Sequence, residues 1–339
     1  MKHSTSMNIA SSRPVFPHPR RALLGGLCLL AGVVLPGSAR AESLLAYHQD
    51  GTIYTASALD GKNPKKICRG DDPCISDDGR FLTFTRNGAL PAKDKRTGQQ
   101  GAAPRSIIVR ELATGKETTL PANGATQVYG AMWSADDTWI AFNHLDKKSW
   151  QVAVVHPDGT ALHTLTGKLD TKGEGYYLAG WNQHDGGVLV QNLETMAQID
   201  PAKGEVSWQR PVKELTGEDG ASSDMRCTIS ADGKLLVATR YVEDDEFDNL
   251  DGPSSYLVLK DFPDGKPRRA TPEKFDVATP WLESGGETVL LRGFTQRDIT
   301  PVRNSDGVRL KTRIYRYNIP SGKLTPLMKQ GEYPSASRG

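Results

Sequence analysis

The chain repeats one short phrase, which is Ser-x-Asp followed by Gly or Asp and then by an apolar run. The phrase begins at Ser76, Ser134 and Ser230, and Asn182 opens a related version 48 residues from each of the last two serines. A strand, a tight turn and a second strand that return at intervals of roughly 50 residues are typical of a β-propeller, in which each repeat forms one blade. We therefore expect an all-β fold in which functional residues occupy equivalent positions of successive blades.

The first 41 residues have the organisation of a secretory signal peptide. An apolar stretch spans 22–35 and is shorter than the roughly 20 residues that a membrane-spanning helix needs. A basic region precedes this stretch, and a small-x-small cleavage site, Ala39-Arg40-Ala41, follows it. We expect a periplasmic protein that does not span the membrane. Export by the Sec route is favoured, and the pair Arg20-Arg21 leaves the twin-arginine route open.

Cleavage of this leader changes the net charge. The whole chain has 42 Lys and Arg against 40 Asp and Glu. The leader contains five basic residues and no acidic residue, so 37 basic and 40 acidic residues remain, a net charge of −3. No basic run with interleaved aromatic residues is left in the sequence. The composition therefore gives no support to a nucleic acid as partner.

Three cysteines follow the leader. Cys68 and Cys74 flank a turn-forming sequence, Arg69-Gly-Asp-Asp-Pro. In an oxidising compartment we expect a disulfide that closes this loop, because the rival interpretation, a metal site, lacks a nearby His or a second Cys pair. Cys227 occupies the apolar strand position that Cys74 occupies in its own repeat, so we expect a buried thiol there.

The 298 residues after the leader divide into six units of four short strands. Turns such as Asp158-Gly159 and Asp264-Gly265 separate strands within a unit, since Asp-Gly is a strong hairpin signal. The first unit lacks an inner strand, and we expect the C-terminal segment from Glu332 to supply it and close the ring. Residues 42–339 are thus predicted to form a single six-bladed β-propeller domain of four-stranded blades, with units at 44–69, 72–122, 127–167, 175–215, 222–272 and 278–330.

Three details of the repeat resemble a known family. An inner strand ends at Trp133-Ser134, a third strand leads to Asp158-Gly159, and the unit closes with Leu165-Thr166. These features resemble the WD40-like propeller repeats of the periplasmic protein TolB and its relatives, over essentially the whole chain after the leader. TolB also has an α/β domain ahead of its propeller, whereas strands begin here close to the predicted cleavage site. Similar repeats occur in propeller domains of prolyl-oligopeptidase-like peptidases and of some lyases.

The resemblance directs attention to the mouth of the central channel. Adjacent strands of a blade run in opposite directions, so the end of each second strand and the start of each inner strand share one face. Arg86 and Arg240, at second-strand ends, are suited to clamp a carboxylate or another anion by forked pairing. The alternative is that strand ends are polar because they are solvated. The predicted ligand-binding residues of this face are His48, Arg86, His144, Asn192, Arg240 and Arg292.

Long connections follow the second strands at 87–105, 243–254 and 295–311, and long loops on one face of a rigid scaffold are common binding elements. For 91–101 the composition favours plain disorder. The second connection contains six carboxylates, which a calcium site, a partner-facing acidic loop or a solvated loop would each explain. We expect no other cofactor. The candidate calcium ligands are Glu243, Asp244, Asp245, Asp248 and Asp251.

The sequence favours a binding module over an enzyme. It has no Gly-x-Ser-x-Gly elbow, and six blades leave no length for a hydrolase domain. His48 and His144 are the only histidines expected at the channel mouth. A metal-dependent catalytic centre needs more converging ligands than these two. We expect an exported propeller that binds an envelope protein or peptide through its channel-mouth face. The alternative is a carbohydrate-active, lyase-like enzyme with a metal site at the same face.

Overall fold

In the computed structural model of the chain, residues 42–93, 96, 100–146, 149–169, 175–217, 219–242, 254–302 and 308–338 are described. The described residues all belong to one compact unit, Arg40–Gly339. The predicted signal peptide, residues 1–41, lies outside the described residues. Among the residues that the structure describes, no helix combines the length and the apolarity needed to cross a bilayer.

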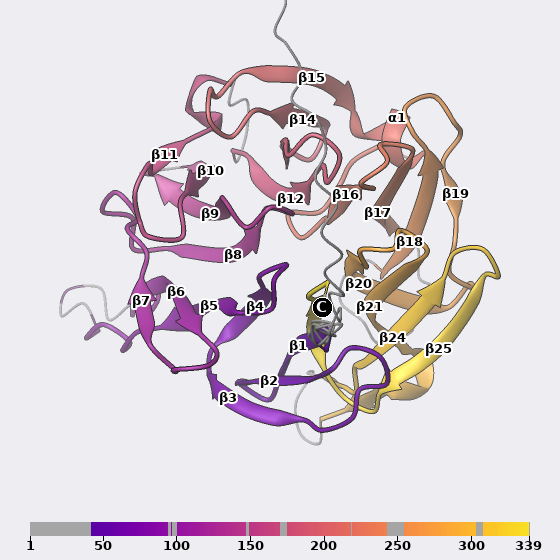
Figure 1. The fold of residues 1–339 in the computed structure, drawn as a ribbon, viewed down its shortest axis with the longest axis horizontal. Coiled ribbons are helices and arrows are strands. Elements are labelled where there is room, and N and C mark those ends of the chain that lie inside the picture. Colours follow the sequence, from indigo (N-terminus) through magenta and orange to yellow (C-terminus); the bar gives the residue numbers. More distant parts are fainter. Residues whose placement is uncertain are drawn as a thin grey trace, which may run out of the picture. The chain divides into compact units, whose positions relative to one another are not determined.

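Six four-stranded antiparallel sheets surround a central channel in the unit Arg40–Gly339 (Figure 1). Short apolar strands separated by Gly- and Asp-containing turns form such blades, because alternate side chains pack against the blade on either side. The prediction of an all-β, six-bladed propeller is confirmed. From the channel outward, the first three blades consist of β26 (Glu332–Ala336), β1 (Leu44–Gln49), β2 (Thr52–Ser57) and β3 (Lys65–Arg69); β4 (Asp71–Ile75), β5 (Phe81–Asn87), β6 (Arg105–Glu111) and β7 (Glu117–Thr119); β8 (Val128–Trp133), β9 (Ile140–Asp146), β10 (Ser149–Val155) and β11 (His163–Thr164).

The other three blades repeat this order, and short helices lie in the connections. The long connection of the last blade also contains a small hairpin of β22 (Ile299–Pro301) and β23 (Val308–Leu310), and the helices are η1 (Thr166–Lys168), α1 (Val212–Thr216) and η2 (Gln296–Asp298). From the channel outward these blades consist of β12 (Tyr177–Trp181), β13 (Val188–Gln191), β14 (Thr195–Ile199) and β15 (Val206–Pro211); β16 (Cys227–Ile229), β17 (Leu235–Val242), β18 (Ser254–Asp261) and β19 (Arg268–Arg269); β20 (Phe275–Leu282), β21 (Thr288–Thr295), β24 (Arg313–Asn318) and β25 (Lys323–Met328).

The C-terminal strand closes the ring, as predicted. β26 is the inner strand of the first blade and pairs antiparallel with β1, with Leu45 opposite Ala336 and His48 opposite Glu332. Ser335 extends the closure to the second blade, since its Oγ accepts a hydrogen bond of 3.0 Å from the backbone N–H of Ile75. The two ends of the described chain therefore share one sheet.

The repeated serines and aspartates build the turns between inner and second strands. Ser134 Oγ donates a hydrogen bond of 2.6 Å to Asp136 and accepts one of 2.9 Å from the backbone N–H of Trp139. The same two bonds occur at Ser76 and Ser230. Short polar side chains that bond to nearby backbone in this way favour turns. The turn role expected of the repeat aspartates is therefore confirmed.

Five of the six inner strands contain a bulge, where the pairing register with the second strand shifts. In three of them a residue with positive φ precedes a proline: Asp72 (φ 50°), Thr279 (φ 48°) and Tyr333 (φ 50°). Gly130 (φ 66°) lies at the bulge of β8. Proline is tolerated here because inner strands are sheet edges, and a bulge re-aims the side chains near it.

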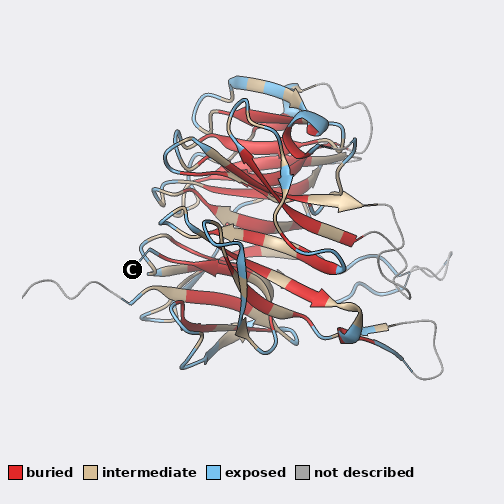
Figure 2. Cartoon of the chain, turned by 90° about the vertical axis from the view of Figure 1, so that its right-hand side faces the viewer, coloured by how far each residue is buried: buried red, intermediate tan, exposed pale blue. Residues whose placement is uncertain are grey.

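The hydrophobic core consists of layers between neighbouring blades, and Figure 2 shows buried residues concentrated in the strands. One cluster joins Cys74 and Ile107 of the second blade to Trp133 and Phe142 of the third. Others of similar size join the third blade to the fourth and the fourth to the fifth. Apolar side chains alternate between the two faces of each sheet, so every blade packs against the blade on either side. A blade therefore depends on its two neighbours for stability.

The predicted disulfide is wrong, because Cys68 and Cys74 are both free. Cys68 lies in the outer strand of the first blade and Cys74 in the inner strand of the second, and the two thiols pack in different apolar clusters. Six residues of largely extended chain can span roughly 20 Å, which is far beyond disulfide reach. The expectation for Cys227 is confirmed, since its thiol is buried.

Candidate binding site in the central channel

One mouth of the channel is wide and polar. Its cavity has a volume of about 250 Å³. The residues that line it come from the starts of inner strands, from the end of the second strand β5 and from the start of the third strand β6. This is the face on which the sequence predicts the binding surface. We call this cavity the polar mouth, and its lining residues are Asp71, Asp72, Thr85, Asn87, Arg105, Tyr129, Asp224, Arg226 and Tyr333.

Asp72 is the most deeply enclosed acid of the polar mouth. Its Oδ2 accepts a hydrogen bond of 3.3 Å from Thr85 Oγ1. Burial raises the pKa of this carboxyl, and the nearby Arg226 guanidinium opposes the shift. The neighbouring Asp71 is engaged differently, since its Oδ2 accepts from Asn87 Nδ2 at 2.8 Å and its Oδ1 lies 3.3 Å from His48 Nε2. Asp72 thus faces the cavity as a partly desolvated acid with spare hydrogen-bonding capacity.

Two tyrosines stand beside Asp72 in the polar mouth. Burial raises the pKa of the Tyr333 phenol to about 12, and the charges of Asp72 and Asp224 add to this rise. Burial also raises the pKa of Tyr129, where Asp224 and Asp72 again contribute. The two acids therefore lie within electrostatic range of both phenols. Within the described part of the chain, neither hydroxyl has a hydrogen-bond partner.

Arg226 stands at the centre of the channel. It lines the polar mouth, the cavity at the opposite end and a cavity of about 40 Å³ between them. Its Nη1 donates a hydrogen bond of 3.2 Å to the carbonyl of Leu178 and lies 3.4 Å from Met132 Sδ. These contacts hold the guanidinium against the third and fourth blades.

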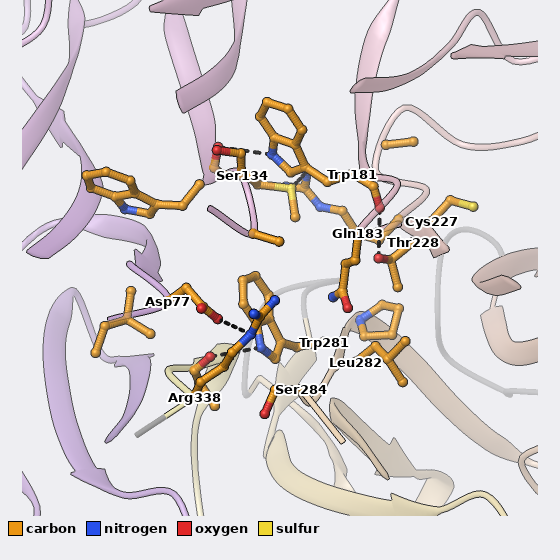
Figure 3. A pocket seen from close by; sticks show the side chains of 18 residues that line it. Asp77, Ser134, Trp181, Gln183, Cys227, Thr228, Trp281, Leu282, Ser284 and Arg338 are labelled. Carbon is orange, nitrogen blue, oxygen red and sulfur yellow. Dashed lines mark hydrogen bonds and ion pairs between the residues drawn. The ribbon is translucent and has the colours of Figure 1, made fainter. Parts of the chain in front are cut away.

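The opposite mouth is narrower and aromatic. This tryptophan mouth has a volume of about 50 Å³ and is lined by Trp133, Trp181 and Trp281 at the ends of inner strands. The indole N–H of Trp181 donates to the carbonyl of Met132 and that of Trp281 to the carbonyl of Ala336, both at 3.2 Å. Figure 3 shows Trp281 beside the ion pair of Asp77 and Arg338, whose atoms lie 2.9 Å apart. Two of the three indoles and this ion pair therefore join one blade to the next, whereas the buried indole N–H of Trp133 has no partner among the described residues.

Comparison with solved structures identifies the fold. The TolB protein from Acinetobacter baumannii superposes with a TM-score of 0.58 over 88% of this chain and 67% of that chain, at 14% sequence identity. This chain has the fold of a TolB-like propeller. A protein described as TolB from Agrobacterium tumefaciens gives a TM-score of 0.56 over 86% of this chain and 91% of that chain, at 12% identity.

A third structure is less similar. An oligogalacturonate lyase in complex with manganese has a TM-score of 0.49 and 15% identity over 82% of this chain and 74% of that chain, so it supports no statement about this TolB-like propeller. No protein-family model and no curated protein sequence matches the chain.

Four predicted binding residues of the TolB-like propeller contact other parts of their own blades. Arg86 makes a forked pair with Glu117 of β7, with N–O distances of 2.8 and 3.1 Å. His144 Nε2 lies 3.1 Å from Thr164 Oγ1 of β11, and burial lowers the pKa of this imidazole. Asn192 caps its own turn by accepting from Thr195 at 2.8 Å, and Arg240 lies over the ring of Tyr256. The structure does not bring these four side chains together, and their ligand-binding role stays a prediction.

The other two predicted residues face inner strands. In the second to fifth blades, the backbone N–H of the residue that opens the turn donates to a carbonyl five positions before the predicted binding residue. In the second blade, for example, Ser76 donates to Phe81, and Arg86 lies five positions after Phe81. The same bond from Ser337 to Leu44 makes Gln49, not His48, the equivalent of Arg86. His48 therefore points to the opposite side of its strand. It lies 3.3 Å from Asp71 and 3.6 Å from Glu332, while Arg292 pairs with Asp276 of β20 at 3.0 Å.

Metal binding receives no geometric support from the described residues. Among them, no three His, Cys, Asp or Glu side chains come together as metal ligands. The proposed calcium ligands Glu243, Asp244, Asp245, Asp248 and Asp251 lie outside the described residues, so that expectation stays a prediction.

The sequence predicts the face of the cavity but not its lining, because none of the nine lining residues is among the predicted ligand-binding residues. A signal was present, because Pro73, Pro280 and Pro334 each stand three residues before a turn residue. A proline at that spacing marks the inner-strand bulge.

Proposed function

We propose that this TolB-like propeller works in the periplasm and binds a segment of another protein at the polar mouth. One contrast supports the choice of this mouth most strongly. Its cavity of about 250 Å³ is lined by three acids, two guanidiniums and two phenols, whereas the tryptophan mouth has about 50 Å³ and uses two of its three indoles between blades. Concave sites with a few convergent polar groups are where ligands bind.

Exposed apolar side chains in connections of the channel-mouth face support a protein as the partner. Leu90 is 63% exposed and follows the second strand β5, and Val302 is 40% exposed in the connection after the second strand β21. Both connections belong to the channel-mouth face. Isolated exposed apolar residues are ordinary, but on the face that carries a polar cavity they suit a protein contact with apolar anchors and a polar centre.

The proposal is tested by capture from periplasmic extract with charge variants of one face. Asp224 and Asp146 are exposed acids on the channel-mouth face, but only Asp224 lines the cavity. We expect wild type and Asp146→Lys to capture the same protein and Asp224→Lys to lose at least nine-tenths of it. Equal capture by all three forms would exclude the polar mouth as the binding surface.

The carbohydrate-active alternative stays an expectation from the sequence alone. No observation among the described residues favours a catalytic metal at the polar mouth, and the lyase comparison is too distant to support it.

A further inference from the structure

We infer that the polar mouth receives a cationic side chain, lysine or arginine, of the bound segment, and holds it between Asp72, Asp224 and the two tyrosines. This inference rests on the proposed function, because it assumes that a protein segment enters this mouth. It adds the chemical class of the group that is recognised.

The first argument is the charge of the lining. Three carboxylates, Asp71, Asp72 and Asp224, face two guanidiniums, Arg105 and Arg226. Net negative charge around a concave, partly enclosed site attracts a cation more strongly than the same charge on an open surface does. The lining therefore selects against an anionic group and in favour of a cationic one.

The second argument concerns which of these carboxylates already have a charged or polar partner. Asp71 contacts His48 and Asn87. In the described ranges, no ion pair joins Asp72 or Asp224 to an arginine or lysine. Asp72 and Asp224 are thus the two acids with capacity for an incoming cation.

The guanidiniums of the lining contact the wall of the cavity. Arg226 Nη1 donates to Leu178 and touches Met132, and the Arg105 guanidinium lies over the ring of Tyr129, 5.8 Å from its centroid. Because each is held against the wall, both compensate part of the negative charge without filling the cavity. A ligand cation can then approach the acids from solvent.

The third argument is the pair of phenols. Tyr129 and Tyr333 each offer a hydroxyl oxygen that has no partner among the described residues. Tyr333 also offers its aromatic ring, whereas the ring of Tyr129 already contacts Arg105 and Trp150. Cations are attracted to tyrosine rings, and the attraction is larger in desolvated sites. Lysine and arginine also carry several N–H donors, which the two carboxylates and two phenol oxygens accept.

The raised pKa of Asp72 agrees with a site in which a bound cation stabilises the charged carboxylate. Burial raises the pKa of this carboxyl, so the charged form is costly while the cavity is empty. A cation beside it favours the charged form. The enclosed acid is therefore explained if a cation enters the cavity.

The experiment measures the binding of small probes by the full chain, with ligand-induced shifts of tyrosine and tryptophan signals in NMR spectra as the readout. The cationic probes are N-acetyl-arginine amide and N-acetyl-lysine amide. The neutral isostere is N-acetyl-citrulline amide, and the anionic probe is N-acetyl-glutamate amide. We expect the arginine probe to bind at least tenfold more tightly than the citrulline probe, with no binding of the glutamate probe.

Variants locate the effect. Asp72→Asn should weaken the cationic probes at least tenfold, while Asp146→Asn, on the same face but outside the cavity, should leave them unchanged. Asp224→Asn changes an exposed side chain and serves as a second test that does not depend on the enclosed position of Asp72. Equal binding of the citrulline probe, or binding that survives both changes, would overturn the inference.

Failure of this inference and failure of the proposed function give different results. If wild type captures its partner through Asp224 but binds no cationic probe, the inference is wrong and the proposed function stands. If the cationic probes bind at Asp72 but the capture is the same in Asp224→Lys, the proposed function is wrong.

Discussion

At the polar mouth, the backbone conformation and the burial of Asp72 reduce the stability of the fold. Asp72 has a positive φ of 50° before a proline and carries its carboxylate in a partly desolvated cavity. Both features are unfavourable for folding, and strained residues of this kind cluster at binding sites. Asp72 is thus better explained by binding than by stability.

Replacement of Asp72 tests this residue-scale view. A raised carboxyl pKa means that the fold loses stability as the pH rises from the unfolded pKa, about 3.9, to the folded pKa, and the cost is complete above the folded pKa. Asp72→Asn removes the charge and keeps both the turn conformation and the acceptor for Thr85. We expect its Tm at pH 7 to exceed that of wild type by roughly 2 °C or more, with the gain vanishing toward pH 4. A lower Tm at pH 7 would mean that Asp72 is a structural residue.

The pair of His48 and Glu332 predicts a pH dependence of ring closure. A side-chain contact with Glu332 raises the pKa of His48, and the contact with His48 lowers the pKa of Glu332. The histidine contribution is complete below about pH 6.5 and disappears as the pH rises through the raised pKa. The glutamate contribution is complete above about pH 4.3 and disappears as the pH falls through the lowered pKa.

Stabilisation by this pair is therefore largest between these limits. In thermal melts from pH 5 to pH 8, we expect the Tm of wild type to exceed that of His48→Gln most at pH 5–6 and the difference to shrink toward pH 8. Glu332→Gln should show the same trend. A constant difference across this range, in either variant, contradicts the assignment.

At the scale of elements, the inner strands determine how closely the blades approach the axis. Gly180 in β12 has a φ of 158°, and a Cβ there would lie 2.1 Å from the carbonyl oxygen of Cys227 in β16. This distance is far inside van der Waals contact, and the obstacle is backbone. The glycine is required for close packing of the fourth and fifth blades.

Gly180→Ala should therefore cost more than about 3 kcal/mol of unfolding free energy, because two inner strands must separate. Gly186→Ala is the matched control, since Gly186 also has positive φ (74°) but no atom lies within 4 Å of its added Cβ. We expect that change to cost about 1–2 kcal/mol, from backbone strain alone. Urea denaturation of both variants decides, and equal costs would contradict the close approach of β12 and β16.

The closing strand gives a second prediction for an element. Truncation after Gly331 removes β26, whose residues 334–336 are buried, and exposes the inner edge of β1. We expect the Tm to fall by more than ~10 °C or the protein to associate, as measured by thermal melting and size-exclusion chromatography. Arg338→Ala should cost less than about 1 kcal/mol, since its pair with Asp77 is partly solvent-exposed. A truncated chain as stable as wild type would contradict the closure.

The local chemistry of the sequence was sufficient for much of the fold. Ser-x-Asp turns and alternating apolar strands are short-range features, so they predicted the blades, the turn role of the aspartates and the closing strand. The cysteine pairing failed because proximity in sequence was taken for a turn, whereas the chain is extended between two blades. The lining of the polar mouth depends on inner-strand bulges, which bring Asp72, Tyr129 and Tyr333 together from three blades and leave only the spacing of prolines as a sequence signal.

At the scale of the whole molecule, the two channel mouths have different roles. At the tryptophan mouth, the indoles of Trp181 and Trp281 and the Asp77–Arg338 pair join neighbouring blades around a small cavity. At the polar mouth, side chains from four blades surround a larger cavity and keep capacity for a ligand. We therefore expect a partner to contact one end of the ring only.

Photo-crosslinking from each mouth in turn tests this central claim most directly. Asn87→p-benzoylphenylalanine places the crosslinker at the polar mouth, and Gln183→p-benzoylphenylalanine places it at the tryptophan mouth of the same protein. In periplasmic extract, we predict a crosslinked partner from position 87 that Asp224→Lys abolishes, and none from position 183. Crosslinking from position 183 alone, or from position 87 without any effect of Asp224→Lys, would contradict the account.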